Sequence, residues 1–299
     1  MVLEKSILNK FNGILLINKG EGISSHNQLT PIKKILPKGT KIGHTGTLDP
    51  NATGLLVVAI GRATKFIQHF EKSSKIYSAK LTFGYSSDTQ DIWGNLVKEN
   101  EIKLTESEFK DCLNSFMGDI FQVPPMYSAI KKNGVPLYKL ARKGINVDRK
   151  KRRIKIYSLD VKSFNYPEVN IDIECSKGTY IRTLIYDIAK KLGTSAVMSN
   201  LVRKKSDYFY LEDAIKLDEI KSINDIEKNI ISLDVAFKNL KRIQVDKIHA
   251  NHIKNGVKVD LLRFCNYEKS DLDYAVYFEE EFVGIARWID GKILTFTKI

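Results

Sequence analysis

The stretch from Ile42 to Val58, IGHTGTLDPNATGLLVV, places one acidic residue, Asp49, in a glycine-rich segment. A carboxylate can attack a carbon centre or accept a proton, but it can also begin a turn before a proline such as Pro50. His44 stands five positions earlier. From the local pattern alone the turn is the simpler interpretation, because Asp-Pro pairs are common in loops. The sequence therefore poses a choice between a turn residue and a catalytic acid.

Two other chemistries are disfavoured for this stretch. A phosphate-binding loop would need a Gly-Lys-Ser/Thr ending or a Gly-x-Gly-x-x-Gly pattern opening a helix, and neither is present. A metal site would need several ligands at helical or turn spacing, whereas His44 and Asp49 have little else nearby. A second pair, His249 and His252, lies beside Lys-Asn-Gly in a pattern typical of an exposed helix end. We therefore expect no metal.

The composition indicates an ordinary globular protein. Among 299 residues, 43% are hydrophobic and 28% are charged. The longest apolar run, Leu55 to Ile60, is far too short to cross a bilayer, and the first residues lack an apolar signal core. We expect a cytoplasmic protein that is not in a membrane. Cys112, Cys175 and Cys265 have neither paired spacing nor a local histidine, so we interpret all three as reduced packing residues.

The charge is concentrated in one segment. The chain has 48 Lys and Arg against 35 Asp and Glu, a formal charge of +13, and residues 131–155 hold eleven basic residues and one acid, Asp148. Apolar residues such as Leu137 and Leu140 are interleaved with these charges, and Gly144 is a plausible helix stop. The segment is therefore predicted to be folded. Its density of cations favours a nucleic-acid backbone over an acidic protein as the partner.

Strand and helix patterns alternate along the chain. A buried strand is predicted in GILLINK, and half-buried strands with period-two alternation are predicted in IYSAKLTFGY and VNIDIECS. A helix is predicted in TESEFKDCLNSFMG, where Thr105 and Glu108 form a capping box and Gly118 ends the pattern. TYIRTLIYDIAKKLG predicts a second helix before Gly193. This mixture indicates an α+β fold.

The predicted secondary structure changes near Phe237. A long helical pattern runs from about Leu211 to Phe237, and short strands and turns follow it. FVGIARWIDGKILTFTKI predicts a hairpin that turns at Asp290 and Gly291. We therefore predict a large α+β domain in residues 1–237 and a small, mostly β domain in residues 238–299.

Several segments together resemble the TruB family of pseudouridine synthases. GHTGTLDPNATGLL fills every fixed position of the family's signature loop, Gly-His-x-Gly-x-Leu-Asp-Pro-x-Ala-Thr-Gly-x-Leu. Other segments resemble the family's further motifs in chain order: KGEGISS, KIYSAKLTFG, SDTQDIWG, PPMYSAIKKNGVPLYKLARKG, CSKGTYIRTLIYDIAKKLG and LVRKKSDYF. The first motif departs from the family pattern, which usually has proline where Gly20 stands. The resemblance runs from about Asn12 to Phe237.

This resemblance implies a fold and a reaction. The fold would be a mixed, mainly antiparallel sheet flanked by helices, followed by a small PUA-like RNA-binding domain. The reaction would convert uridine to pseudouridine at position 55 in the T-loop of tRNA, after the base is flipped out, and would need no cofactor or metal. Asp49 would be the catalytic residue, as nucleophile or proton acceptor. Whether it attacks the anomeric carbon, adds to the ring or abstracts the 2′ proton stays open in the sequence.

The resemblance also assigns substrate-binding residues. His44 would fill the gap left by the extruded base, and Tyr77 would stack on the uracil. Arg182 would pair with Asp49 and keep its carboxylate ionised in a pocket that excludes water. Pocket lining and support of the Asp49 loop would come from Tyr180, Leu201 and Lys19.

The basic segment would bind the RNA backbone. It lies in an insertion at about residues 124–152, and the expected phosphate contacts are Lys131, Lys132, Arg142 and Lys143. The expected partner is the T-arm of tRNA, bound by a monomer with no obligate protein partner. Two other functions remain open: a tRNA-binding chaperone without catalysis, and a relative that depends on a guide RNA. The Asp49, Tyr77 and Arg182 set argues against the first, and the basic insertion against the second.

Overall fold

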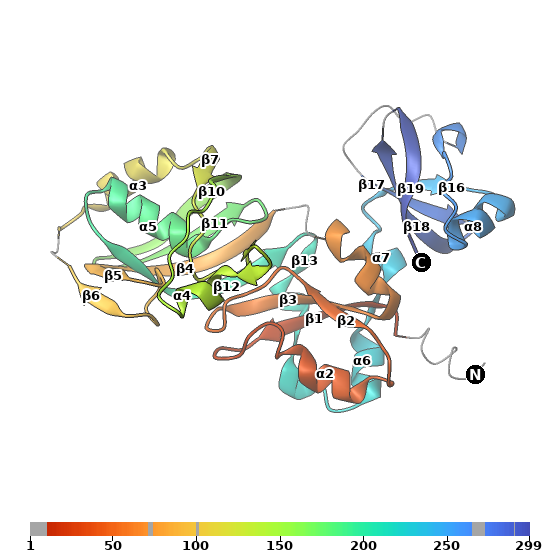
Figure 1. The fold of residues 1–299 in the computed structure, drawn as a ribbon, viewed down its shortest axis with the longest axis horizontal. Coiled ribbons are helices and arrows are strands. Elements are labelled where there is room, and N and C mark those ends of the chain that lie inside the picture. The colour runs from red at the N-terminus through yellow and green to blue at the C-terminus, as the bar shows by residue number, and fades with distance from the viewer. Residues whose placement is uncertain (1–10, 71–73, 100–101, 265–272, 290) are drawn as a thin grey trace. The chain divides into compact units, whose positions relative to one another are not determined.

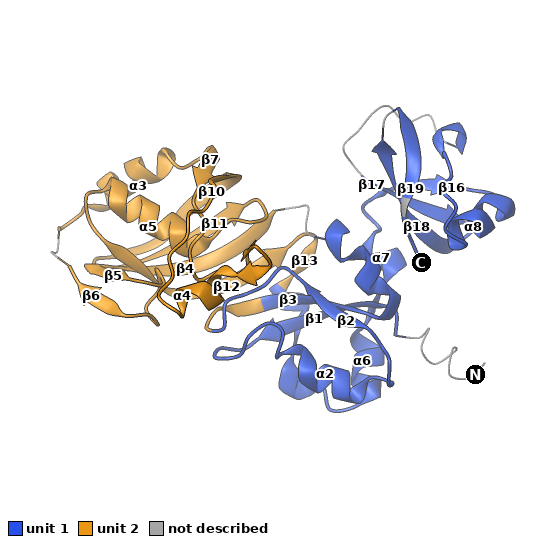
Figure 2. Ribbon diagram, viewed as in Figure 1, with its two compact units in different colours: residues 1–50, 55–71, 211–299 blue, residues 51–54, 72–210 orange. Residues whose placement is uncertain are grey.

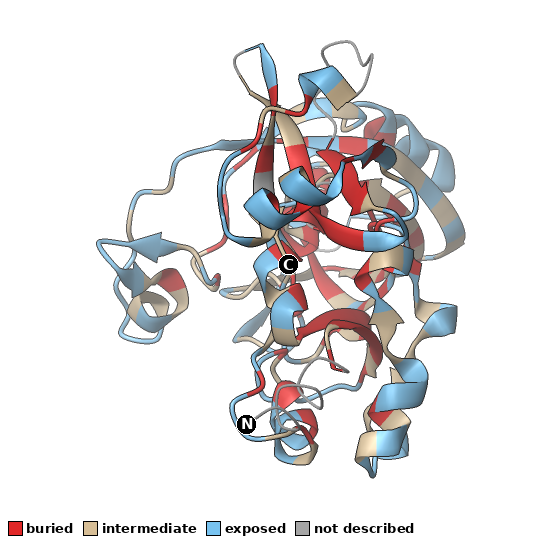
Figure 3. Ribbon diagram, turned by 90° about the vertical axis from the view of Figure 1, so that its right-hand side faces the viewer, coloured by how far each residue is buried: buried red, intermediate tan, exposed pale blue. Residues whose placement is uncertain are grey.

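The protein forms two compact units, each with mixed α and β structure. The computed structural model describes residues 11–70, 74–99, 102–264, 273–289 and 291–299. Unit 1 comprises residues 1–50, 55–71 and 211–299, and unit 2 comprises residues 51–54 and 72–210 (Figures 1 and 2). The order of helices and strands confirms the α+β class predicted from the sequence. Buried residues gather along the strands, while exposed residues lie mostly on helices and loops (Figure 3).

Unit 1 contains a sheet built around β1. Its strands are β1 (Gly13–Lys19), β2 (Ile42–Thr45), β3 (Thr53–Ile60), β14 (Ile215–Lys216) and β15 (Ile231–Ser232). Strand β1 runs parallel to β14 and antiparallel to β15, and β3 lies beside it. Strands β1 and β3 are almost entirely buried. Burial of both faces explains why they read as continuous apolar runs rather than as alternating strands.

Four helical segments of unit 1 pack against strands β1 and β2 of this sheet. They are α2 (Leu29–Ile35), the 3₁₀ segment η1 (Gly61–His69), α6 (Ile223–Asn229) and α7 (Leu233–Ala236). Apolar residues of α2 and α6 join those of β1 and β3 in one core, which includes Ile32, Val58 and Ile226.

The long helix predicted from Leu211 to Phe237 is wrong. The segment is broken into η2 (Leu211–Asp213), β14, η3 (Leu217–Glu219), α6, β15 and α7. Ile215 and Ile231 pair with β1 as strand residues, and Ser222 and Ser232 each begin a new short helix as N-caps. Apolar residues spaced three or four apart therefore serve successive short elements, and pairing with β1 overrides their helical pattern.

The C-terminal part of unit 1 is a second sheet with its own core. The order is β16 (Lys241–Gln244), β17 (Asp273–Phe278), β18 (Glu281–Ile289) and β19 (Lys292–Lys298), with helix α8 (Lys247–Lys254) packed on it. The predicted hairpin is confirmed, since β18 and β19 are antiparallel, β18 ends at Ile289 and β19 begins at its partner Lys292. Of the predicted turn, Asp290 lies outside the described residues, and Gly291 has a φ of 81°.

This second sheet contacts η1 through buried polar and aromatic groups. His69 Nδ1 lies 2.5 Å from Asp273 Oδ2, and Arg287 Nε donates to Asp273 Oδ1 at 2.7 Å. Phe237, the predicted domain boundary, is buried and stacks on Phe70 at a ring-centroid distance of 4.5 Å. The division into residues 1–237 and 238–299 stays a prediction, and residues 211–299, which run across Phe237, all belong to unit 1.

Unit 2 contains an antiparallel sheet in the order β12-β4-β11-β10-β7. Its strands are β4 (Lys75–Phe83), β7 (Gly118–Gln122), β10 (Arg152–Asn165), β11 (Glu168–Cys175) and β12 (Ala196–Ser206), with β13 (Phe209–Tyr210) paired to β12. Two short hairpins are β5 (Tyr85–Ser87) with β6 (Leu96–Lys98), and β8 (Lys131–Lys132) with β9 (Val135–Pro136). The strands predicted in IYSAKLTFGY and VNIDIECS are confirmed as β4 and β11.

Among its described residues, unit 2 has the helices α3 (Glu106–Asn114), α4 (Leu137–Ala141) and α5 (Ile181–Lys191). Helix α3 begins with the predicted capping box, in which Thr105 accepts from the Glu108 N–H and the Glu108 carboxylate accepts from the Thr105 N–H. Helix α5 packs on β12 and β4, and α3 packs on β10. Helices α3 and α5 therefore cover part of one face of the sheet.

The cysteine prediction holds for the two cysteines that the structure describes. Cys112 and Cys175 are buried and free, and burial raises the pKa of the Cys175 thiol to about 12. Cys265 lies outside the described residues. Among those residues, no helix is long and apolar enough to cross a membrane.

Candidate active site

Asp49 lies in the connection of a β-hairpin. Strands β2 and β3 are antiparallel, with Thr45 opposite Val57, and residues 46–52 join them. The connection opens at Gly46, which has a φ of 72°. Gly54, just after it, has a φ of 98°, and a Cβ there would stand 2.5 Å from the Arg203 carbonyl oxygen. These two positions require glycine, which explains part of the glycine spacing in the opening motif.

Two buried side chains hold the loop on either side of Asp49. The Ser25 hydroxyl accepts from the Leu48 N–H at 2.8 Å and donates to the Leu48 carbonyl at 2.9 Å. The Lys19 ammonium donates to the Pro50 carbonyl at 2.7 Å and to the Gly20 carbonyl at 2.9 Å. Ser25 and Lys19 are 1% and 0% exposed. The backbone is therefore fixed immediately before and after Asp49, whose own side chain is half-buried.

His44 belongs to the same hairpin. It lies on β2 opposite Val58 and is half-buried. The five-residue interval from His44 to Asp49 therefore runs from the end of strand β2 into the loop. The resemblance gave this residue a role at the flipped base, and that role stays a prediction.

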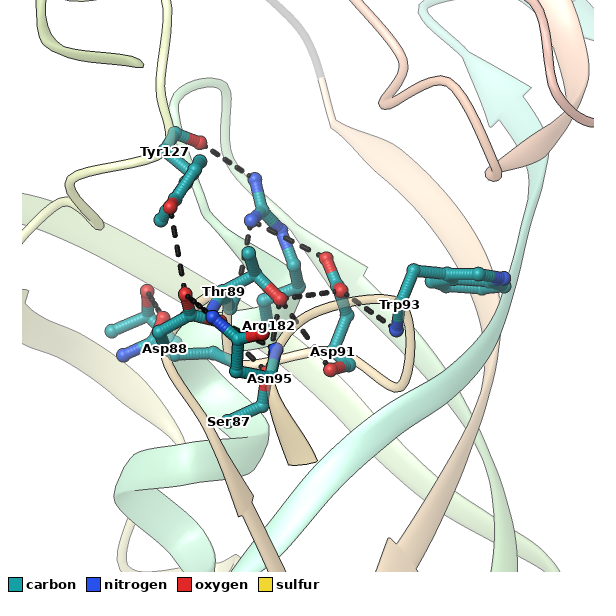
Figure 4. Close-up of polar contacts among 10 residues, drawn as sticks. Ser87, Asp88, Thr89, Asp91, Trp93, Asn95, Tyr127 and Arg182 are labelled. Carbon is teal, nitrogen blue, oxygen red and sulfur yellow. Dashed lines mark hydrogen bonds and ion pairs between the residues drawn. The ribbon is translucent and has the colours of Figure 1, made fainter. Parts of the chain in front are cut away.

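Arg182 lies in the first turn of α5 in unit 2, where neighbouring groups of the same unit hold its guanidinium. It donates to the Thr89 carbonyl and the Tyr127 carbonyl, each at 2.9 Å, and lies 3.5 Å from Asp91 Oδ2 (Figure 4). The residue is only 4% exposed. A buried guanidinium needs such partners, because an unpaired buried charge is very costly. Its predicted pairing with Asp49, which belongs to unit 1, stays a prediction.

Asp91 is itself held by the loop between β5 and β6. Its Oδ1 accepts from the Thr89 hydroxyl at 2.7 Å and from the Trp93 N–H at 3.1 Å (Figure 4). One oxygen of the carboxylate thus serves the loop, and the other faces Arg182. Two residues of the acidic motif SDTQDIWG, Thr89 and Asp91, therefore bind the Arg182 guanidinium.

Tyr180 precedes α5 and is fixed through its backbone. The Gln122 side chain accepts from the Tyr180 N–H at 2.8 Å and donates to the Tyr180 carbonyl at 3.0 Å. Gln122 ends β7 and is 2% exposed. A buried amide with both ends satisfied fixes the entry of the helix that carries Arg182.

Tyr77 and Leu201 share one face of the unit 2 sheet. Leu201 pairs with Ala79, and Arg203 pairs with Tyr77, so the side chains of these residues lie on the same side. This is the buried side, where Tyr77 is 7% exposed and Leu201 is 5% exposed. The structure thus brings together, within unit 2, the tyrosine and the leucine that the resemblance assigned to the base pocket.

The basic segment is exposed, as phosphate contacts require. Lys131 and Lys132 form β8, while Arg142 and Lys143 follow α4, and all four are exposed. Gly144 has a φ of 71°, which ends the helical turn as predicted. The segment is therefore a folded element with its charges in solvent.

Sequence reasoning missed three anchoring residues. Ser25, Asp91 and Gln122 received no role, although Ser25 and Asp91 lie inside motifs singled out above. For Ser25 and Asp91 the signal was a polar residue in a motif without an assigned task, whereas Gln122 lies outside the motifs and gave no such signal. What each one touches depends on residues 23 to 91 positions away, which spacing alone does not reveal.

The histidine pair of the second sheet shows no metal set. His249 and His252 lie on α8, where Asp246 is the N-cap and accepts from the His249 N–H. They line a cavity of about 660 Å³ together with Lys258, Asp260 and Arg263, among others. Within the part of the chain that the structure describes, no three His, Cys, Asp or Glu residues are grouped to hold a metal ion.

The sequence is similar to a family model and to proteins of known activity. A family model described as TruB family pseudouridylate synthase (N terminal domain) matches residues 33–181. A tRNA pseudouridine synthase B from Clostridium tetani is 43% identical over 277 residues, which cover 92% of this chain and 95% of that protein. One from Francisella tularensis subsp. tularensis is 39% identical over 297 residues, covering 98% and 96%.

Solved structures share the fold. The protein in a crystal structure of a Cbf5-Nop10-Gar1 complex matches with a TM-score of 0.73 at 24% identity, covering 99% of this chain and 86% of that chain. One in an archaeal box H/ACA sRNP Nop10-Cbf5 complex matches with a TM-score of 0.72 at 21% identity, covering 99% and 88%. At this identity the likeness establishes the fold alone.

Proposed function

This chain belongs to the TruB family of pseudouridylate synthases and is a tRNA pseudouridine synthase, an isomerase; from that premise we propose that it modifies uridine 55 of the T-loop and that Asp49 carries the chemistry. The observation that supports this proposal best is the loop from Leu48 to Pro50. Buried Ser25 and Lys19 fix the backbone on both sides of a half-buried carboxylate. An ordinary Asp-Pro turn needs no such support.

The isomerisation defines what the site must do. The bond from the ribose C1′ to N1 of uracil breaks, the base rotates, and a bond from C1′ to C5 forms. The proton on C5 is lost, and N1 gains one, so no oxidant or reductant is consumed. Asp49 is the nucleophile or the proton acceptor in this sequence. A carboxylate held in place before substrate binds avoids the entropic cost of orienting it during the reaction.

Residues of unit 2 have supporting tasks in this proposal. Tyr77 and Leu201 hold the extruded uracil from the buried face of the sheet, and Gln122 sets the position of Tyr180. Arg182 pairs with Asp49 while Asp91 and two carbonyls fix its guanidinium. The guanidinium is always charged, so it would stabilise the ionised form of the Asp49 carboxylate.

A direct assay tests the proposal. The purified protein, with no added RNA other than unmodified tRNA, is expected to form pseudouridine at position 55 and at no other position. The Asp49→Asn variant is the negative control and is expected to form no pseudouridine. Formation of pseudouridine only after a guide RNA is added would support the guide-dependent alternative. Binding of tRNA without any pseudouridine would support the chaperone alternative.

A further inference from the structure

One edge of the unit 2 sheet exposes aromatic and basic side chains together. Strands β7 and β10 pair in antiparallel register, and residues alternate between the two faces. On the covered face Ile154, Ile156 and Gln122 are buried. On the opposite face, which we call the outer face, lie Phe121, Arg153 and Lys155, all of them exposed. Tyr157, at the β-bulge that follows Ile156, is also exposed, and we count it with the outer face because its ring lies beside Lys155 Nζ.

Phe121 is the most unusual of these residues. It is 69% exposed, and Tyr157 is 45% exposed. Phe121 is directly opposite Arg153 in the strand register, so a large apolar ring stands beside a guanidinium in solvent. Strand β7 ends the order of the sheet, and edge strands are usually kept free of exposed apolar side chains because these promote association. An exposed phenyl ring on an edge strand therefore suggests that another molecule packs against it.

The charged groups of the outer face are already arranged. Asp119 accepts from Arg153 Nε at 3.2 Å and from Nη2 at 2.9 Å, which orients the guanidinium plane. Lys155 Nζ lies 5.4 Å from the centre of the Tyr157 ring. A cation beside an aromatic ring is the combination that binds single-stranded nucleic acid, where the ring stacks on a base and the cation meets a phosphate.

The outer face is continuous with the basic segment. Strand β10 begins at Arg152, so Arg153 and Lys155 are the last cations of residues 131–155. The Arg149 guanidinium donates to the Pro124 carbonyl at 3.1 Å, which ties the end of the insertion to its beginning, next to β7. A polyanion bound by the insertion is therefore led onto the outer face by the same run of positive charge.

We propose that the outer face is a stacking platform for an unpaired nucleotide of the bound RNA, with Phe121 and Tyr157 as the stacking residues. The proposal rests on the proposed function, because it takes RNA as the substrate. It adds a contact that depends on bases rather than on phosphates. Recognition by stacking tolerates any base, since every base has a π-face.

The decisive variant is Phe121→Ala with Tyr157→Ala, measured by the Kd for unmodified tRNA over a range of salt. Loss of one stacked base weakens binding about five-fold or more. We expect that loss with an unchanged slope of log Kd against log salt. Arg153→Gln with Lys155→Gln is expected instead to make the dependence of log Kd on log salt less steep. The Phe121→Trp variant, with the native Tyr157, keeps a ring at both positions and is expected to bind tRNA with a Kd near that of the parent.

The matched control lies on the hairpin of β12 and β13. Tyr208 and Tyr210 are 52% and 43% exposed, and Lys205 Nζ lies 5.2 Å from the Tyr210 ring. Tyr208→Ala with Tyr210→Ala removes similar rings outside the run of charge and is expected to leave the Kd unchanged. Melting curves establish that every variant is folded.

Two outcomes would overturn the platform. One is a Kd within two-fold of the parent for the folded Phe121, Tyr157 variant. The other is a change in self-association of that variant with RNA binding intact, which would make the outer face a protein contact. Neither outcome touches the proposed function, which fails only if the parent protein binds tRNA and forms no pseudouridine.

Discussion

The loop at Leu48–Pro50 and the basic segment at residues 131–155 use charge in opposite ways. The loop holds one half-buried carboxylate, and buried Ser25 and Lys19 fix its flanks. The basic segment holds eleven cations, and the four expected phosphate contacts among them are all exposed. A fixed group is valuable for its position, whereas exposed groups act through their number. Substitutions in the loop should therefore change rate, and substitutions in the segment should change affinity.

Asp49→Asn should give the largest effect. The amide keeps the size of the side chain and is acceptable before proline, but it is a poor nucleophile and cannot accept a proton near neutral pH. Single-turnover assays are expected to show no pseudouridine, while tRNA affinity stays within a few-fold of the parent. Mass spectrometry excludes deamidation back to Asp. Substantial turnover by verified Asn protein would make Asp49 a turn residue.

Arg182→Met should come next. It removes the guanidinium that contacts Asp91 and donates to the Thr89 and Tyr127 carbonyls, and breaking a buried charge pair costs about 3–5 kcal/mol. We expect a lower melting temperature and a severe loss of single-turnover rate. A double-mutant cycle in unfolding free energy, combining Arg182→Met with Asp49→Asn, tests the pairing of the two residues. Strict additivity of the two changes would argue against it.

Ser25→Ala should reduce rate more than affinity. The change leaves the buried Leu48 N–H without its acceptor, at a cost of about 1–3 kcal/mol, and frees the loop beside Asp49. Misplacement of a catalytic group by about 1 Å can lower the rate about 100-fold. Ser24→Ala is the matched control, because that half-buried hydroxyl accepts only from the Asn27 N–H among the contacts described. Equal rates for the two variants would remove Ser25 from this role.

Neutralising the basic segment should have the smallest effect on rate. Changing Lys131, Lys132, Arg142 and Lys143 to Gln is expected to weaken tRNA binding and to reduce the salt slope by about 0.7–0.9 for each lost contact. At saturating tRNA the single-turnover rate should stay near that of the parent. An unchanged salt slope would exclude this segment from the RNA interface.

Local signals predicted much of the fold. The capping box of Thr105 and Glu108 was legible because both partners lie within one helical turn. The segment after Leu211 was misread, because its short strands exist only through pairing with β1, some two hundred residues earlier in the chain. Sequence periodicity records the burial of a residue but not the element that buries it.

The candidate site shows the same limit. Asp49 was found because its loop is a continuous motif. Its anchor Ser25 and the Tyr180 anchor Gln122 act over 23 and 58 positions. Both are small or neutral polar residues without chemistry of their own, so only the folded chain reveals their tasks.

The discontinuity of unit 1 has a consequence for synthesis on the ribosome. Unit 2 is complete once residue 210 has emerged, whereas unit 1 still lacks β14, β15 and the second sheet, which packs on His69. Because compact units fold as their last residues become available, the basic segment reaches its final form before the unit that carries Asp49. The growing chain therefore completes the unit with the cationic surface before it completes the unit that holds Asp49.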